Sequence, residues 1–176
     1  RVSTSNGDDT TGWGSRIEIK DGTPTELKPF IATKIATNVD APVAITYSPD
    51  GKQLVIGEMG EVNVPGDSLL TFYDPKSGKL TNSYKTDLSD IAGLAYSPTT
   101  GKLYAVDFAW AEPDKGGLFE LVIDGDAVKS TKIVGLDKPA ALAFDKAGKL
   151  YLAVFGSGEE NAEKSPGTLQ VIDAGL

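Results

Sequence analysis

Three stretches of the sequence repeat one another and decide the fold: residues 42–52 (PVAITYSPDGK), 91–102 (IAGLAYSPTTGK) and 139–149 (PAALAFDKAGK). In each stretch, a short apolar run enters a turn that ends in a Gly-Lys pair. The glycines of these pairs are 50 and 47 residues apart, and a period of this length is typical of a propeller blade with four short strands.

The rest of the chain follows the same order. A second apolar run comes after each turn, followed by a long polar loop and then by a third run. No segment shows a 3.6-residue period, so the sequence predicts an all-β fold, a β-propeller of four-stranded antiparallel blades. We expect the blades at residues 1–40 (the end of one blade), 41–89, 90–137 and 138–176 (a blade without its last strand).

We expect two strands in the first partial blade, the second of them at residues 27–36, four in each complete blade and three in the last. These thirteen strands do not fill a ring of four-stranded blades, so two blade faces would be left open. Three arrangements would cover them: the N-terminal half of the same propeller, a second copy of the chain, or closure as an irregular small ring. We favour the first, because a ring closed by its own N-terminus would leave the last blade without its fourth strand.

The composition excludes several kinds of chemistry. The chain has no Cys and no His, which excludes disulfides, thiolate metal sites, cysteine nucleophiles and a Ser-His-Asp triad within the chain. Its formal net charge of −8 opposes binding to nucleic acid and to anionic membrane surfaces. No apolar run is long enough for a membrane helix, so we expect no membrane insertion.

Acidic residues concentrate in the long loops that a propeller places on one face. This face is predicted to attract a cation, a basic partner or a small-molecule ligand, although acid-rich loops also serve solubility alone. Exposed aromatic side chains in such loops can bind sugars or flat ligands, or can cap the core beneath them. The candidate residues of this face are Glu58, Glu61, Asp107, Trp110, Glu112 and Glu159.

Glu58 and Asp107 end the second strand in two neighbouring blades. Two carboxylates at the mouth of the channel could share a metal ion such as Ca²⁺ or act as a general base. Val154 stands at the same place in the next blade, so the ring of acids is broken.

The repeats resemble those of NHL and senescence-marker/gluconolactonase propellers, whose pattern is P-x-G-[LIV]-A-x-[SD]-P-D-G. Residues 56–60, 64–66 and 91–96 are more closely similar to the C-terminal half of secreted bacterial NHL-like propellers of the scytonemin-cluster type. The resemblance covers roughly residues 37–176 and implies a six-bladed or similar ring and export from the cytoplasm. Gluconolactonase-type enzymes hold a divalent metal with Glu, Asn and Asp, but Ala92 replaces the expected Asn, which counts against a metal hydrolase.

The sequence therefore favours an exported binding or interaction module without recognisable catalytic machinery. The alternative is a Ca²⁺-dependent hydrolase of the lactonase or strictosidine-synthase-like kind, which would use Glu58 and Asp107. A third hypothesis is that the chain is a structural repeat within a larger surface protein.

Overall fold

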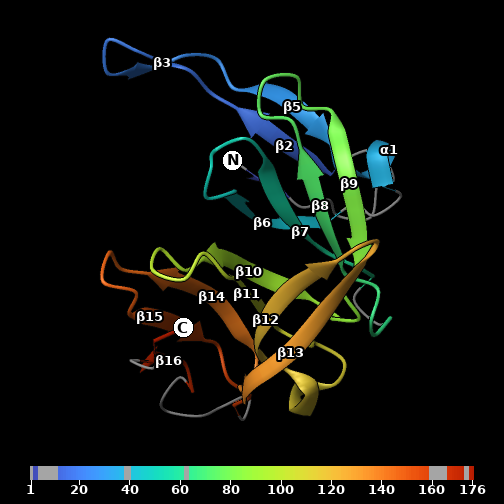
Figure 1. Cartoon of the computed structure of the whole chain (residues 1–176), viewed down its shortest axis with the longest axis vertical. Helices are drawn as coiled ribbons and strands as arrows, with labels where there is room; N and C mark the ends of the chain where they lie inside the picture. Colours follow the sequence, from blue (N-terminus) through green and yellow to red (C-terminus); the bar gives the residue numbers. More distant parts are fainter. Residues whose placement is uncertain (1, 4–11, 38–40, 62–63, 159–165, 173–174) are drawn as a thin grey trace.

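The computed structural model describes residues 2–3, 12–37, 41–61, 64–158, 166–172 and 175–176. Two four-stranded antiparallel sheets form the centre of the molecule (Figure 1). We call the first sheet blade II; it consists of β6 (Ala41–Tyr47), β7 (Leu54–Met59), β8 (Leu69–Tyr73) and β9 (Leu80–Lys85). We call the second blade III; it consists of β10 (Ile91–Tyr96), β11 (Leu103–Asp107), β12 (Gly117–Asp124) and β13 (Ala127–Gly135).

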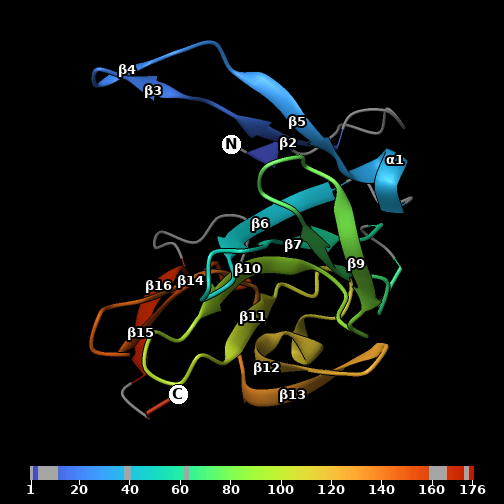
Figure 2. The same ribbon diagram turned by 45° about the horizontal axis from the view of Figure 1, so that its top comes forward.

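A three-stranded sheet flanks each side of this centre. Blade IV consists of β14 (Pro139–Phe144), β15 (Leu150–Val154) and β16 (Thr168–Ile172). Blade I consists of β1 (Val2–Ser3), β2 (Trp13–Arg16) and β5 (Lys28–Ala32). The short hairpin of β3 (Ile19–Lys20) and β4 (Thr23–Pro24) extends blade I into an arm that projects from the body (Figure 2). These antiparallel sheets confirm the predicted all-β, propeller-type architecture.

The first blade differs in detail from the prediction. Residues 27–36 were expected to form one strand, but β5 ends at Ala32 and the helix α1 (Thr33–Thr37) follows it. The Thr37 hydroxyl has two acceptors for its one proton, the Thr33 carbonyl within this turn of helix and the Glu58 carboxylate, each at 2.9 Å. Pro24 and Pro29 lack the N–H that a sheet ladder needs, which is consistent with the interrupted pairing between the two sides of the hairpin. A turn of 3₁₀ helix, η1 (Pro113–Lys115), lies in the loop after β11.

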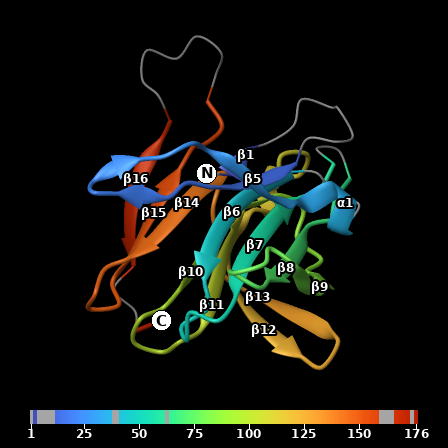
Figure 3. The same cartoon turned by 90° about the horizontal axis from the view of Figure 1, so that it is seen from above.

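Blades that follow one another in the chain are also neighbours in space, as the view from above shows (Figure 3). The first strands β6, β10 and β14 contact one another in that order, as the inner strands of a propeller do. Among the described residues, no helix is long and apolar enough to cross a membrane.

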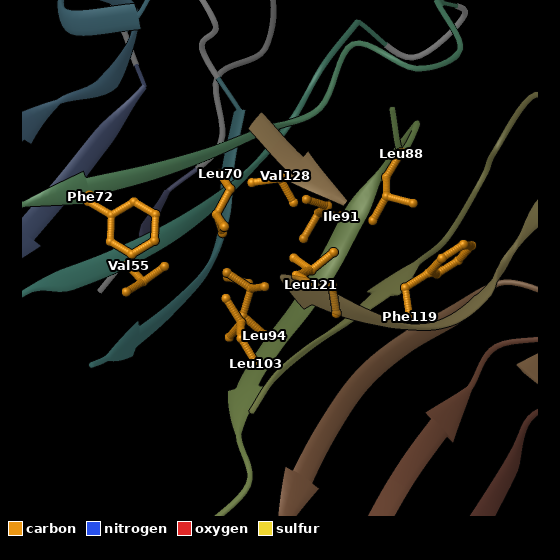
Figure 4. Packing of buried hydrophobic residues seen from close by; sticks show 12 residues of the cluster. Val55, Leu70, Phe72, Leu88, Ile91, Leu94, Leu103, Phe119, Leu121 and Val128 are labelled. Carbon is orange, nitrogen blue, oxygen red and sulfur yellow. The ribbon is translucent and has the colours of Figure 1, made fainter. Parts of the chain in front are cut away.

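The largest apolar core lies between blades II and III (Figure 4). Side chains on one face of blade II, including Val55, Leu70 and Phe72, pack there against Ile91 and Leu94 of blade III. A second core joins blade III to blade IV, and a third joins blade I to blade II. Each blade is thus held by apolar side chains that alternate along its strands.

Candidate functional site

The second strand of each blade ends beside the long loops, where the sequence places Glu58 and Asp107. Glu58 is completely buried and is surrounded by hydroxyl groups. Thr71 and Tyr73 donate hydrogen bonds to its Oε1 atom at 2.8 and 3.1 Å, and Thr37 donates to Oε2 at 2.9 Å. This burial differs from the expected position on an open face, and it makes Glu58 a bridge between β7, β8 and the helix α1.

The Glu58 carboxylate and burial together raise the pKa of Tyr73, with burial as the larger cause. The unfolded chain releases the tyrosine proton near the ordinary pKa of 10.0, whereas the folded chain keeps it to higher pH. The stability that this difference contributes is complete below pH 10 and is lost as the pH rises through the folded pKa. The free energy of unfolding, measured with urea between pH 9 and pH 11, should therefore fall less steeply with pH in Tyr73→Phe than in the wild type. Equal slopes in the two proteins would contradict a raised pKa of Tyr73.

Asp107 is also buried, at 3% exposure, but its partners are backbone groups. Its Oδ1 atom accepts hydrogen bonds from the N–H groups of Asp90 and Ala109, at 2.7 and 3.2 Å. Its Oδ2 atom accepts a hydrogen bond from the N–H of Ser89 at 3.1 Å. Asp107 therefore fastens the segment that enters β10 to the loop that leaves β11.

These arrangements do not fit a calcium ion shared by Glu58 and Asp107. All four carboxylate oxygens already accept hydrogen bonds, from hydroxyls in one case and from backbone N–H groups in the other. Within the described part of the chain, no group of three or more acidic side chains could hold a metal ion. We therefore derive no chemistry through a metal at these two residues.

A pocket of about 240 Å³ opens on the loop side, lined by Met59, Asp90, Phe108 and Trp110. The Phe108 and Trp110 rings are stacked, with centroids 5.6 Å apart and an angle of 12° between their planes. Phe155 contacts Phe108 at a centroid distance of 6.0 Å. Trp110 and Phe155 are 54% and 60% exposed, so the cluster offers an aromatic surface to solvent. We call this cavity the loop-face pocket.

Asp90 supplies the only carboxylate among the described residues that line the loop-face pocket, and it is 2% exposed. Its Oδ2 atom accepts a hydrogen bond from the Trp110 backbone N–H at 2.6 Å. Its Oδ1 atom is buried and has no hydrogen-bond partner among the described residues. Burial is the largest cause that raises the pKa of Asp90, and the charges of Asp107 and Asp67 raise it further.

Asp90→Asn should increase the free energy of unfolding at pH 7 by roughly 1 kcal/mol, because it removes a buried charge. The asparagine carbonyl can still accept the hydrogen bond from Trp110. Since the folded pKa of Asp90 lies above the unfolded value of 3.8, the wild type gains stability on protonation, and the difference from the variant should shrink toward acid pH. Urea unfolding at pH 7 and pH 4 measures this; a variant less stable than the wild type at pH 7 would contradict it.

Two residues with left-handed backbone conformations border the loop-face pocket. Ala109 has φ +47° and is completely buried between Phe108 and Trp110. The corresponding residue of the next blade is Gly156, which adopts the same conformation without a Cβ penalty. Lys138 has φ +54°, and its ammonium group lies 5.4 Å from the centre of the Trp110 ring. The local backbone is therefore held in an unusual conformation where the aromatic side chains project.

The other predicted site residues are scattered. Glu61 is exposed and donates its backbone N–H to Asp67 Oδ2 at 2.8 Å. Glu112 forms an ion pair with Lys115 at 2.8 Å. Glu159 lies outside the described residues. Of the six predicted residues, Trp110 lines the loop-face pocket. Asp107 supports the backbone next to Trp110, because it accepts a hydrogen bond from the Ala109 N–H.

Asp90 and Phe155 were not singled out as site residues from the sequence, whereas Phe108 was one of the loop aromatics expected to bind a ligand or cap the core. Equivalent positions at the ends of the second strands of three successive blades hold Met59, Phe108 and Phe155, as the pairing of the preceding residues Glu58, Asp107 and Val154 shows. A large apolar residue repeated at this position is the sequence signal that could have identified the aromatic cluster.

A larger cavity of about 300 Å³ lies between blades I and II, near Phe30, Ile45 and Tyr47. Among the described residues that line this cavity, Arg16 is the charged one, and its guanidinium carbon lies over the Phe30 ring, 4.3 Å from the ring centre. We give the loop-face pocket priority because its stacked aromatic side chains lie beside Asp90, whose buried Oδ1 atom has no hydrogen-bond partner among the described residues.

No family model and no curated protein sequence matches the chain. Its structure resembles that of a periplasmic gluconolactonase from Pseudomonas aeruginosa, with a TM-score of 0.60 and 16% identity, over 89% of this chain and 47% of that one. It also resembles a gluconolactonase from Xanthomonas campestris, with a TM-score of 0.51 and 18% identity, over 76% of this chain and 39% of that one. The chain spans less than half the length of either structure. The likeness shows that this chain has the β-propeller fold of gluconolactonase-like proteins.

Proposed function

We propose that this chain belongs to an extracytoplasmic β-propeller that binds a small, neutral, polyhydroxylated molecule in the loop-face pocket. The observation that carries the proposal is the Oδ1 atom of Asp90, which is buried beside stacked aromatic side chains and finds no partner in the part of the chain that the structure describes. A buried carboxylate oxygen without a donor is costly, and a ligand hydroxyl would supply the missing hydrogen bond.

The aromatic side chains support the same class of ligand. The C–H face of a sugar-like ring can pack on an exposed aromatic surface such as that of Trp110 and Phe155. An anionic ligand is disfavoured, because Asp67 and Asp107 lie close enough to Asp90 to raise its pKa by their charge.

One of the similar solved structures supports the proposed location. It is a periplasmic gluconolactonase, which agrees with an extracytoplasmic location for this chain. Membership of a six-bladed ring, completion by further blades, and the likeness to scytonemin-cluster propellers are parts of the same proposal.

Ligand binding can be tested by thermal unfolding of the chain with increasing concentrations of methyl glucoside and of glucono-1,5-lactone. A ligand that binds only the folded state raises the melting temperature with concentration. We expect the rise in the wild type and its loss in Trp110→Ala and Asp90→Asn, with Glu112→Gln as the matched surface control. No rise with either compound would contradict this ligand class.

Lactone hydrolysis is a second candidate function, favoured by the two gluconolactonase structures. Asp90 would accept a proton from a water molecule while the water oxygen bonds to the lactone carbonyl carbon. The ring C–O bond would then break, and the proton would pass to the ring oxygen, which leaves an open-chain hydroxy acid.

Proton release from glucono-1,5-lactone, measured against a protein-free blank, tests this reaction. The general base must be deprotonated, so the rate should fall as the pH is lowered through the raised pKa of Asp90. Asp90→Asn should reduce the rate to that of the blank. Ligand-dependent stabilisation without hydrolysis would support the binding function alone.

A further inference from the structure

Asp90 and Lys138 hold the same position in two successive blades, immediately before the first strand. The carbonyl of each accepts a hydrogen bond at 2.9 Å from the N–H of the aromatic residue that follows the second strand of its blade, Phe108 for Asp90 and Phe155 for Lys138. Their side chains carry opposite charges, and both contact Trp110. A carboxylate and an ammonium group of neighbouring blades thus meet at one residue of the loop-face pocket.

Trp110 is fixed at both its main chain and its ring. The Oδ2 atom of Asp90 accepts a hydrogen bond from the Trp110 backbone N–H at 2.6 Å. The ammonium group of Lys138 lies over the indole ring, 5.4 Å from its centre, which is within the range of cation–π attraction. The Phe108 ring stacks on the same indole. The ring is therefore held by two contacts, although the Trp110 side chain is 54% exposed.

The loop that carries Trp110 is also fastened to the segment that leads to Lys138. The Leu136 N–H donates a hydrogen bond to the Gly116 carbonyl at 3.2 Å. The Lys132 ammonium group donates to the Lys115 carbonyl at 2.7 Å. The contact between Lys138 and Trp110 thus completes a series of links between this loop and the start of blade IV.

The backbone conformation of Lys138 is unfavourable for a lysine. Its φ of +54° lies in the left-handed region, which glycine adopts more readily than any residue with a Cβ atom. Stability alone would therefore favour glycine at residue 138. Residues held in this conformation cluster at functional sites, so the lysine side chain points to a role in the pocket.

We propose that Lys138 is a positioning residue for the loop-face pocket, whose ammonium group holds the Trp110 ring against Phe108 while its carbonyl holds Phe155 nearby. This role rests on the proposed binding of a neutral polyhydroxylated ligand. A ligand that packs on an aromatic surface loses less free energy to side-chain ordering when the rings are already in place. Removal of the ammonium group should therefore weaken binding without weakening the fold.

Lys138→Gly is the sharpest variant, because it relieves the left-handed backbone while it removes the ammonium group. We expect its urea midpoint to equal or exceed that of the wild type, and its affinity for methyl glucoside and glucono-1,5-lactone to fall about fivefold. Lys138→Gln should lose as much affinity, whereas Lys138→Arg keeps a cation over the ring and should retain it. Asp21→Gly relieves a φ of +50° in the turn of the projecting arm (Figure 2) and is the matched control, with unchanged affinity.

Collisional quenching of Trp110 fluorescence tests the contact without any ligand. In a Trp13→Phe background, the ammonium group of Lys138 attracts iodide to Trp110 but has no such effect on neutral acrylamide. The ratio of iodide quenching to acrylamide quenching should fall in Lys138→Gln and Lys138→Gly, and it should persist in Lys138→Arg.

An unchanged quenching ratio in Lys138→Gln would overturn the contact between Lys138 and Trp110, whether or not a ligand binds. If the wild type binds either compound and Lys138→Gly binds it equally well, the positioning role is wrong while the proposed function stands. If the wild type binds neither compound, the proposed function is wrong and the positioning role falls with it.

Discussion

Glu58→Ala should lower the free energy of unfolding by roughly 3 kcal/mol at pH 7. The substitution leaves the fully buried Tyr73 hydroxyl without the acceptor that it now uses, and leaves the Thr71 hydroxyl with the Ile56 carbonyl as its acceptor. It also removes the carboxylate acceptor through which the Thr37 hydroxyl joins the helix α1 to blade II. Urea unfolding followed by circular dichroism measures the change.

Two further variants separate the hydrogen-bond network from the effect of removing an acid. Glu58→Gln keeps the volume and one carbonyl acceptor, so its loss should be about half that of the alanine variant. Glu61→Ala removes an exposed acid three residues away and should change stability by less than about 0.5 kcal/mol. Equal, small effects for Glu58→Ala and Glu61→Ala would show that the buried network contributes little.

Gly57→Ala should cost about 2–3 kcal/mol, because the second and third blades meet at this residue. A Cβ atom at Gly57 would lie 2.5 Å from Cγ2 of Ile91 and 3.0 Å from Cδ1 of Leu94. Ile91 is completely buried in the core between the blades, so it has no free space into which to move.

The matched control is Gly135→Ala, on strand β13. A Cβ atom there meets nothing within 4 Å, and the backbone is not left-handed. We expect this variant to be neutral or slightly stabilising, since alanine loses less conformational entropy on folding. Equal urea midpoints for the two variants would contradict the close contact between blades II and III at Gly57.

The repeats were sufficient to predict the fold because each carries its own strand and turn signals. The Gly51 and Gly101 turns, with φ of +70° and +71°, close hairpins where the sequence places them. The helix α1 was missed because residues 33–37 have no apolar period and are ordered by Thr37. A five-residue helix leaves too little pattern to recognise.

The candidate site was harder to predict, since strand alternation does not reveal which acid is enclosed. Glu58 and Asp107 share one position in the repeat, yet hydroxyls surround the first and backbone N–H groups the second. Apart from Ala109, these partners come from segments 13 to 21 residues away in the chain. Asp90 was overlooked because its importance depends on Trp110, which lies 20 residues further on.

The most direct test of the central claim, that the loop-face pocket binds a neutral polyhydroxylated ligand, is the fluorescence of Trp110. The chain has two tryptophans, so Trp13→Phe leaves Trp110 as the sole reporter inside the site. Titration of this variant with glucono-1,5-lactone or methyl glucoside should give a saturable change in emission, which Asp90→Asn abolishes. Emission that stays constant, or that changes equally with and without Asp90, would contradict the account.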